Sequence, residues 1–192
     1  MIRKLYDWTI SMADHPRALW VLAFVAFIES SVFPIPPDVL MIPMILAAPH
    51  RAWLIASVAL VSSVLGGMAG YAIGYFAYDS IGQPVLEALG KGDAIEAFNT
   101  RFNDFGFWAV LTAGVTPFPY KVITILSGWT GMPLGTFIAT SILARGLRFF
   151  IVAGLLWKYG APIRDFIERR LGLMFTLFMI LLVGGFFAVG LL

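Results

Sequence analysis

The sequence lacks cysteine and is poor in charge. With no cysteine among its 192 residues, disulfide bonds are excluded. Only 12% of the residues are charged, against about 25% in soluble domains. The net charge of +2 is too small to indicate a nucleic acid as partner. With 60% hydrophobic residues and a mean hydropathy of +0.89, the composition predicts an all-α polytopic membrane protein.

Sequence signatures of common enzymes are missing as well. The chain has no H-E-x-x-H, no G-x-S-x-G and no Walker loop. Its only histidines, His15 and His50, stand at the edges of apolar segments, where histidine more often marks the end of a helix than a metal site. We therefore expect no enzyme activity, no cofactor and no metal.

The pattern of apolar and polar stretches predicts one membrane domain, 1–192, made of six consecutive segments. They are an interfacial helix (1–14), a first repeat (17–78), an acidic polar loop (79–104), a second repeat (105–157), a basic cytoplasmic loop (158–170) and a terminal transmembrane helix (171–192). Within the repeats, 53–78 and the stretch from 131 to 157 are long enough to cross the hydrocarbon core of about 30 Å.

Prolines interrupt both repeats. The interruptions are Pro34, Pro36 and Pro37 in the first repeat, and Thr116, Pro117 and Pro119 in the second. Proline lacks the N–H that a helix needs and clashes with the preceding turn. In lipid, such a break is tolerated only where protein or a water-filled cavity covers it. We predict a re-entrant helical hairpin at each break; the alternative is a full span followed by an interfacial helix.

The two broken blocks also resemble each other. Pro34–Leu40 aligns with Pro117–Ile123, and a full span follows each block. If both hairpins are re-entrant, most lysines and arginines of the loops fall on one face of the membrane, and only Lys91 and Arg101 fall on the other. Because positive loops stay in the cytoplasm, we predict a cytoplasmic amino terminus, an external carboxyl terminus and two opposed hairpins. This is an inverted repeat, by default in a bacterial inner membrane.

Five charged residues fall inside the apolar blocks: Glu29, Asp38, Lys121, Arg145 and Arg148. Each charge in hydrocarbon costs about 2.5 kcal/mol or more, so we predict that they share a polar cavity on the substrate or proton pathway. The three cations would attract an anionic group such as phosphate, and either acid could exchange a proton. The alternative is that Glu29 and Asp38 pair with Arg145 and Lys121 only to neutralise one another.

Glycines predict close packing of helices. Gly66, Gly70 and Gly74 recur every fourth residue and form one smooth helix face. Small residues at this spacing let a second helix approach closely. We favour packing within the bundle over dimerisation, and we assign Gly128 to the same role.

Five motifs resemble the DedA family (SNARE-associated, or VTT-domain, membrane proteins), and most closely its YqaA-like branch. They are F-I-E-S-S-x-F-P-x-P-P-D (27–38), G-G-x-x-G-Y-x-x-G (66–74), T-P-F-P-Y-K-V (116–122), S-G-x-x-x-M-P (127–133) and R-G-x-R-F-F (145–150). The resemblance implies opposed re-entrant hairpins and movement of lipids across the bilayer. Family members include undecaprenyl phosphate transporters and phospholipid scramblases. Acids that match Glu29 and Asp38 are linked there to proton-driven activity.

The chain departs from the better-known members of that family. They carry arginine at the position of Lys121 and a further arginine where this chain has Val115 and Thr116. We expect a transporter or scramblase of an anionic lipid, undecaprenyl phosphate or a phospholipid, with the membrane lipids as its partners. Two alternatives stay open: a proton-coupled small-solute or ion transporter, and a structural membrane protein with buried ion pairs only. The oligomeric state is left open.

Overall fold

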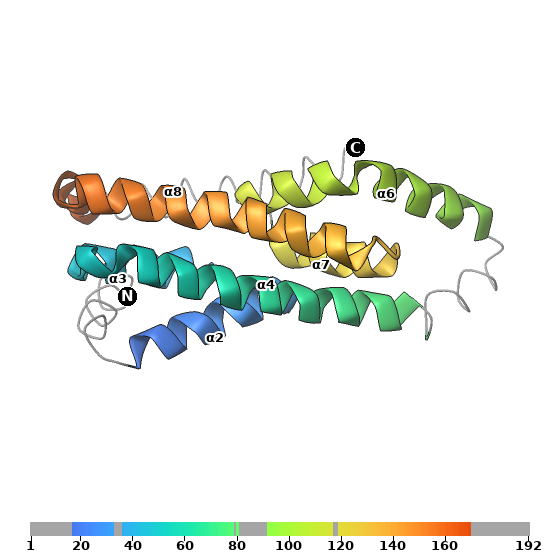
Figure 1. Cartoon of the computed structure of the whole chain (residues 1–192), viewed down its shortest axis with the longest axis horizontal. Coiled ribbons are helices and arrows are strands. Elements are labelled where there is room, and N and C mark those ends of the chain that lie inside the picture. Colours follow the sequence, from blue (N-terminus) through green and yellow to red (C-terminus); the bar gives the residue numbers. More distant parts are fainter. Residues whose placement is uncertain (1–16, 33–35, 79, 81–91, 117–118, 170–192) are drawn as a thin grey trace.

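The computed structural model describes residues 17–32, 36–78, 80, 92–116 and 119–169. Within these ranges, all regular secondary structure is helical, as the composition predicted. The helices run along one long axis (Figure 1). The interfacial helix predicted at 1–14 and the terminal helix predicted at 171–192 lie outside the described residues.

Two short helices and one long helix form the first half of the bundle. Helix α2 spans Ala18–Ser31 and α3 spans Asp38–Ala47, with Pro37 in the capping position before α3. A single 3-10 turn, η1 (Pro49–Arg51), leads into α4 (Ala52–Ala77). In Figure 1, α2 runs toward the middle of the bundle and α3 returns to the end where α2 began. The first break thus falls at the predicted prolines.

The second half repeats this order at the opposite end. Helix α6 spans Gly92–Val115, α7 spans Tyr120–Trp129 and α8 spans Leu134–Arg169. In Figure 1, α6 runs inward from the far end, α7 returns outward and α8 then runs back along most of the bundle. This order is the one expected of an inverted repeat. That the two broken blocks are re-entrant in a membrane remains a prediction.

Helix α6 differs from the predicted boundary between an acidic loop and the second repeat. The prediction ended the loop at 104, but α6 begins at Gly92 and continues to Val115. No proline interrupts 92–116, and Phe98 and Phe102 stand one turn apart with ring centroids 6.1 Å from each other. Apolar residues at this spacing stabilise a helix, so the polar stretch joins the apolar one without a break.

The predicted basic loop at 158–170 is also helical where it is described. Helix α8 continues to Arg169, with a kink at Tyr159, whose φ of −122° and ψ of 24° are not helical. Pro162 follows three residues later and has no N–H to donate to the carbonyl of Lys158. Proline inside a helix commonly bends it without ending it, which accounts for the difference.

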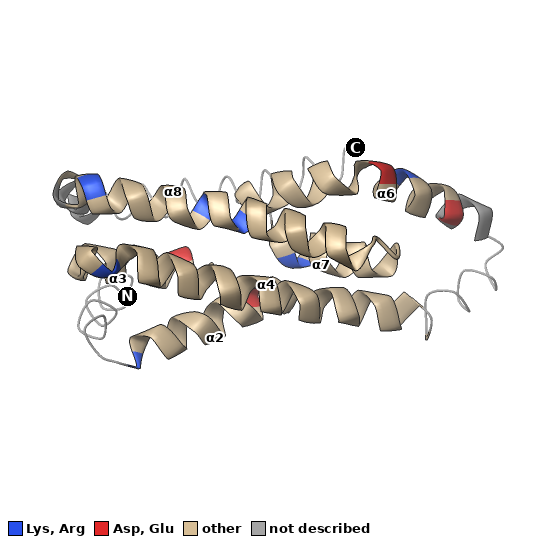
Figure 2. Cartoon of the chain, viewed as in Figure 1, with Lys and Arg blue, Asp and Glu red and all other residues tan. Residues whose placement is uncertain are grey.

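Among the described residues, two helical segments are long and apolar enough to cross a membrane. They are Pro49–Ala77 and Leu134–Gly160, in agreement with the spans predicted at 53–78 and 131–157. At 1.5 Å per residue, each is about 40 Å long. Figure 2 shows few charged residues along these helices, apart from a group near the middle of the bundle.

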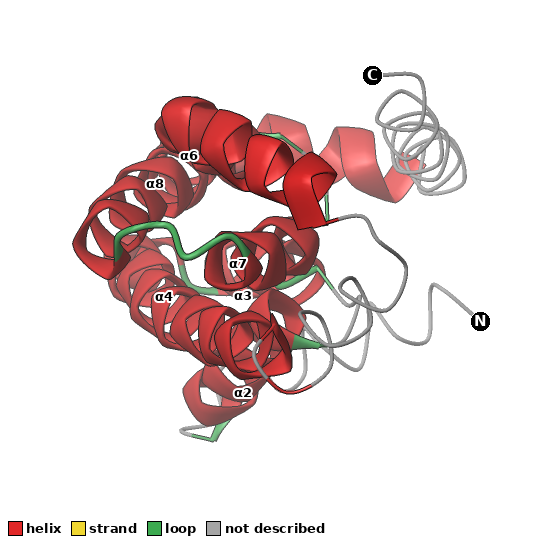
Figure 3. Cartoon of the chain, turned by 90° about the vertical axis from the view of Figure 1, so that its right-hand side faces the viewer, coloured by secondary structure: helices red, strands yellow, loops and turns green. Residues whose placement is uncertain are grey.

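Glycines let α4 contact both broken blocks. A side chain at Gly66 would overlap the backbone of Phe27 in α2, and one at Gly74 would overlap the carbonyl of Ile125 in α7. Gly128 of α7 lies equally close to the carbonyl of Tyr71 in α4, so the contact is reciprocal. Viewed end-on, α4, α8 and α6 form an arc around α7 (Figure 3). These glycines therefore pack within the bundle, in keeping with the favoured interpretation.

Within the part of the chain that the structure describes, the hydrophobic core has two parts, one for each half of the bundle. In the first, Leu22 and Ile45 of the broken block pack with Phe149 of α8. In the second, Val110 and Tyr120 pack with Met132 and Phe137. Helix α8 contributes to both parts, and its two central arginines, Arg145 and Arg148, lie near the junction of the halves.

Candidate functional site

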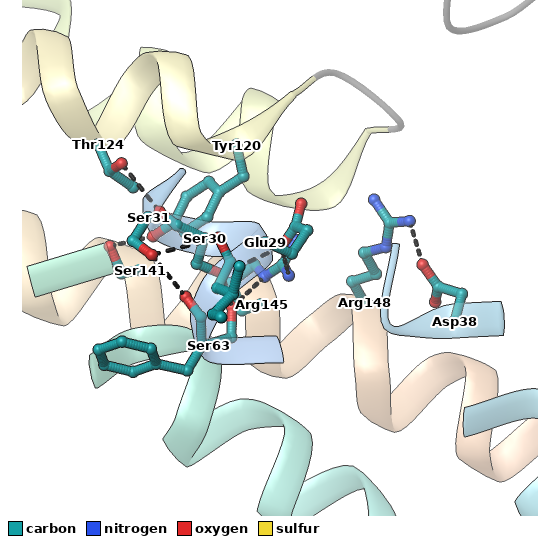
Figure 4. A network of polar contacts seen from close by, with 12 residues as sticks. Glu29, Ser30, Ser31, Asp38, Ser63, Tyr120, Thr124, Ser141, Arg145 and Arg148 are labelled. Carbon is teal, nitrogen blue, oxygen red and sulfur yellow. Dashed lines mark hydrogen bonds and ion pairs between the residues drawn. The ribbon is translucent and has the colours of Figure 1, made fainter. Parts of the chain in front are cut away.

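Arg145 and Glu29 form a buried ion pair between α8 and α2. Arg145 Nη2 lies 2.8 Å from Glu29 Oε2, and the two side chains are only 2% and 12% exposed. The pair joins the second half of the bundle to the first (Figure 4). A buried charge of this kind has to be paired and hydrogen-bonded, because its hydration is lost. The alternative interpretation of the sequence had paired the same two residues.

Serine hydroxyls complete this pair. Ser63 of α4 accepts a hydrogen bond from Arg145 Nε (2.7 Å) and lies 2.7 Å from the hydroxyl of Ser30. The Ser30 hydroxyl lies 3.0 Å from Glu29 Oε2 and is placed to donate to it. Thr124 of α7 donates to the carbonyl of Ser30 (3.1 Å). Side chains of α4, α7 and α8 therefore contact Glu29 or its neighbour Ser30 in α2.

Two aromatic rings enclose the guanidinium of Arg145. Its Cζ lies 4.8 Å from the ring centroid of Tyr120 and 4.7 Å from that of Phe149. A cation over a ring face is attracted by the electrons of the ring, and more strongly where water is excluded. Tyr120 belongs to one part of the core and Phe149 to the other. The hydroxyl of Tyr120 also donates a hydrogen bond to the hydroxyl of Ser141. Arg145 thus lies at the boundary between the two cores.

A second ion pair joins α3 to α8. Arg148 Nη2 lies 2.5 Å from Asp38 Oδ2, and both side chains are 17% exposed. Arg148 also donates through Nη1 to the carbonyl of Thr116 (2.7 Å), just beyond the end of α6. Asp38 is the first residue of α3. Arg148 therefore connects the start of α3 to the end of α6, and Figure 4 shows this pair apart from the network around Arg145.

Lys121 does not form the ion pair that the alternative interpretation gave it. The sequence alternative paired a carboxylate with Lys121, but the carboxylate of Asp38 pairs with Arg148 instead. The ammonium of Lys121 donates to the carbonyl of Val32 (3.0 Å), the residue directly after α2. The negative end of a helix dipole attracts a cation, which explains this position. The five predicted charges thus lie in two ion pairs and one helix-end contact.

Sequence reasoning missed three polar side chains of the site: Ser63, Tyr120 and Thr124. Ser63 extends the face of Gly66 and Gly70 by one turn of α4, so its spacing was a usable signal. Tyr120 lies within the T-P-F-P-Y-K motif, but its position under a guanidinium depends on how α7 packs against α8.

Among the predicted turn residues, Pro37 and Pro119 precede α3 and α7, while Pro34 and Pro117 lie outside the described residues.

The site also bears on metals and cofactors. Within the described ranges, no group of three or more histidine or acidic side chains is placed to hold a metal ion. The acids at the site are instead matched one to one by arginines. What this arrangement offers chemically is a set of cations that can bind anions, and carboxylates that compete for them.

Comparison with known proteins identifies the family. Residues 35–158 match the VTT domain. The chain is 38% identical over 168 residues to an uncharacterized protein of Haemophilus influenzae, covering 85% of this chain and 87% of that one. A Histophilus somni protein, also named as uncharacterized, is 40% identical with the same coverage. No solved structure matches significantly. The chain belongs to the VTT-domain (DedA, or SNARE-associated) family of membrane proteins.

Proposed function

We propose that this protein moves an anionic lipid across the bacterial inner membrane, as a transporter or scramblase. The observation that supports this most is the pair of carboxylate–arginine contacts between the broken helices and α8. Arg145 and Arg148 lie about 17 and 21 Å along the α8 span of about 40 Å, hence near its middle. Ionisable residues at membrane depth usually mark the path of a substrate or proton.

The chemistry of the pairs suits a phosphate-bearing headgroup. A guanidinium binds carboxylate and phosphate through the same fork of N–H donors. A lipid phosphate can therefore replace a carboxylate as the partner of an arginine, with little change in geometry. Undecaprenyl phosphate and phospholipids both carry this group. That the protein falls in the YqaA-like branch of the family is part of this proposal. So is the restriction of its substrate to one of these lipids.

Proton coupling follows from the same competition. Protonation of a carboxylate removes its negative charge and weakens its hold on the arginine, so a substrate phosphate binds more readily. Deprotonation restores the ion pair and expels the phosphate. In this scheme Glu29 or Asp38 carries the proton, and the arginines and Lys121 hold the lipid.

One observation favours the structural alternative. Arg145 is 2% exposed and bonded on several sides, as expected of a residue that only holds helices together. A structural protein would need both pairs to be closed at all times. A transporter needs at least one pair to open, so the two functions differ in whether lipid moves.

The test is lipid flipping in liposomes that contain the purified protein, with and without a pH gradient. Wild type should flip undecaprenyl phosphate or a phospholipid faster than empty liposomes, and Glu29→Gln or Asp38→Asn should lose the dependence on the gradient. Glu96→Gln, an exposed acid of α6, is the matched control. If wild type flips neither lipid, the proposal fails. If the gradient drives a small solute instead, the ion or solute transporter takes its place.

A further inference from the structure

We infer that the two ion pairs have different tasks in the proposed transport, and this inference rests on that function. Arg148 is the arginine that exchanges its carboxylate, Asp38, for the phosphate group of the substrate. Arg145 stays on Glu29 and holds α2 and α8 in position. Lys121, which like Arg148 is partly exposed, then assists binding, whereas Arg145 is a positioning residue.

The surroundings of Arg145 leave a phosphate little access. Its guanidinium is held by Glu29, by the hydroxyl of Ser63 and between the rings of Tyr120 and Phe149. Only 2% of the side chain is exposed. A phosphate could reach this group only if α2, α4 and the two aromatic rings moved apart. Such a movement would disrupt both parts of the core.

Arg148 is more accessible than Arg145. The side chains of Arg148 and Asp38 are each 17% exposed, so both remain partly accessible. The other bond of Arg148 goes to the carbonyl of Thr116. That bond keeps the guanidinium in place after Asp38 has left, so a free N–H fork is presented to an incoming anion.

The two carboxylates also differ in what holds them when their arginine leaves. Asp38 is the first residue of α3, where the positive end of the helix dipole stabilises a negative charge. Glu29 lies in the last turn of α2, which ends at Ser31, where the dipole opposes a negative charge. Opening the Asp38 pair therefore leaves a carboxylate that the helix dipole stabilises, whereas opening the Glu29 pair leaves one that the dipole opposes and that keeps the Ser30 hydroxyl as its donor. Exchange is easier at Asp38.

The contrast gives different predictions for two similar substitutions, tighter phosphate binding for one and lower stability for the other. In Asp38→Asn the competitor of the phosphate is gone, so Arg148 is free to bind. If the pair leaves Arg148 free about a tenth of the time, its removal tightens apparent binding about tenfold. Glu29→Gln should not tighten binding, because Arg145 stays enclosed, and it should lower the unfolding temperature instead.

The experiment measures thermal stabilisation of the purified full chain in detergent by dihexanoyl phosphatidic acid. Inorganic phosphate and dihexanoyl glycerol, which lacks phosphate, are run in parallel. Asp38→Asn should bind phosphatidic acid about tenfold more tightly than wild type. Arg148→Gln should bind it about tenfold more weakly or worse, with Arg148→Lys intermediate as a variant that keeps the charge. Glu96→Gln should match wild type. Stabilisation by inorganic phosphate as strong as by phosphatidic acid would identify free phosphate as the ligand that Arg148 takes.

The outcomes separate this inference from the proposed function. Wild type that flips lipid while Asp38→Asn binds no tighter, or while Glu29→Gln binds tighter, overturns the division of tasks and leaves the transport function standing. Wild type that neither flips lipid nor is stabilised by phosphatidic acid or phosphate overturns both. A loss of unfolding temperature in Arg148→Gln as large as in Arg145→Gln would also contradict the division, since it would make both arginines structural.

Discussion

Removal of Arg145 is the sharpest test of how the bundle is held together. We consider Arg145→Gln, which keeps a polar side chain of moderate length but removes the charge. The carboxylate of Glu29 then stays near the end of α2, 12% exposed, without its cation. The hydroxyl of Ser63 loses the hydrogen bond that Arg145 Nε donates to it. The rings of Tyr120 and Phe149 lose the guanidinium between them.

The magnitude follows from the burial of the pair. Breaking a buried ion pair by removing one partner costs about 3–5 kcal/mol, because the other charge is left without compensation. The loss of the ring contacts adds about 0.5–2 kcal/mol. We therefore expect Arg145→Gln to lower the free energy of unfolding by about 3.5–7 kcal/mol. For Arg148→Gln we expect a smaller loss, because the 17% exposed pair keeps more of its hydration.

The double variant Glu29→Gln, Arg145→Gln supplies the decisive comparison. With both charges gone, no carboxylate is stranded, so the double variant should be more stable than the sum of the two single losses predicts. The assay is unfolding titrated with sodium dodecyl sulfate in mixed micelles, followed by tryptophan fluorescence. Losses that add within about 0.5 kcal/mol would refute the coupling of Glu29 to Arg145, and with it the reasoning from the pair.

Two further variants test the contacts around the pair. Ser63→Ala removes the hydroxyl that accepts a hydrogen bond from Arg145 Nε and should lower the free energy of unfolding by about 1–3 kcal/mol. The control is Ser57→Ala, whose hydroxyl donates to the carbonyl of Trp53 within α4 and which should change the same unfolding titration little. Equal losses in the two variants would contradict the role of Ser63. Gly74→Ala places a methyl group against the backbone of Ile125 and Trp129 and should cost about 1–3 kcal/mol. Gly135→Ala meets nothing within 4 Å and should be neutral or stabilising, so a matching loss there would exclude close packing as the cause.

Much of the fold could be predicted from local chemistry. Proline fixes where a helix breaks, and the breaks at Pro37 and Pro119 fall where the sequence placed them. The two long spans follow from hydropathy alone. Helix occupies 92–104 and 158–169, where polar loops were predicted. Polar composition was taken for a loop, although a polar face does not by itself prevent a helix, and α8 continues past Gly160 and Pro162 with a kink at Tyr159.

The pairing of charges was harder to predict than their presence. The free-energy cost of a charge at membrane depth indicates that the five charged residues need partners. It does not indicate which partner each residue takes. Asp38 goes to Arg148 and not to Lys121 because the start of α3 faces α8, a matter of packing between distant segments. Ser63 and Tyr120 were missed for the same reason, since neither has a charge that requires an explanation.

The prolines and the two ion pairs are best understood together. Glu29 and Asp38 are nine positions apart, which in an unbroken helix would place them on opposite faces and about 13.5 Å apart along the axis. One carboxylate would then point away from α8, whose Arg145 and Arg148 lie three positions apart and so share a face. The break between α2 and α3 turns the chain, and each carboxylate reaches one arginine of that face. A continuous first helix could not satisfy both pairs, so the broken segment E-S-S-V-F-P-I-P-P-D is what allows both acids to lie within one membrane bundle.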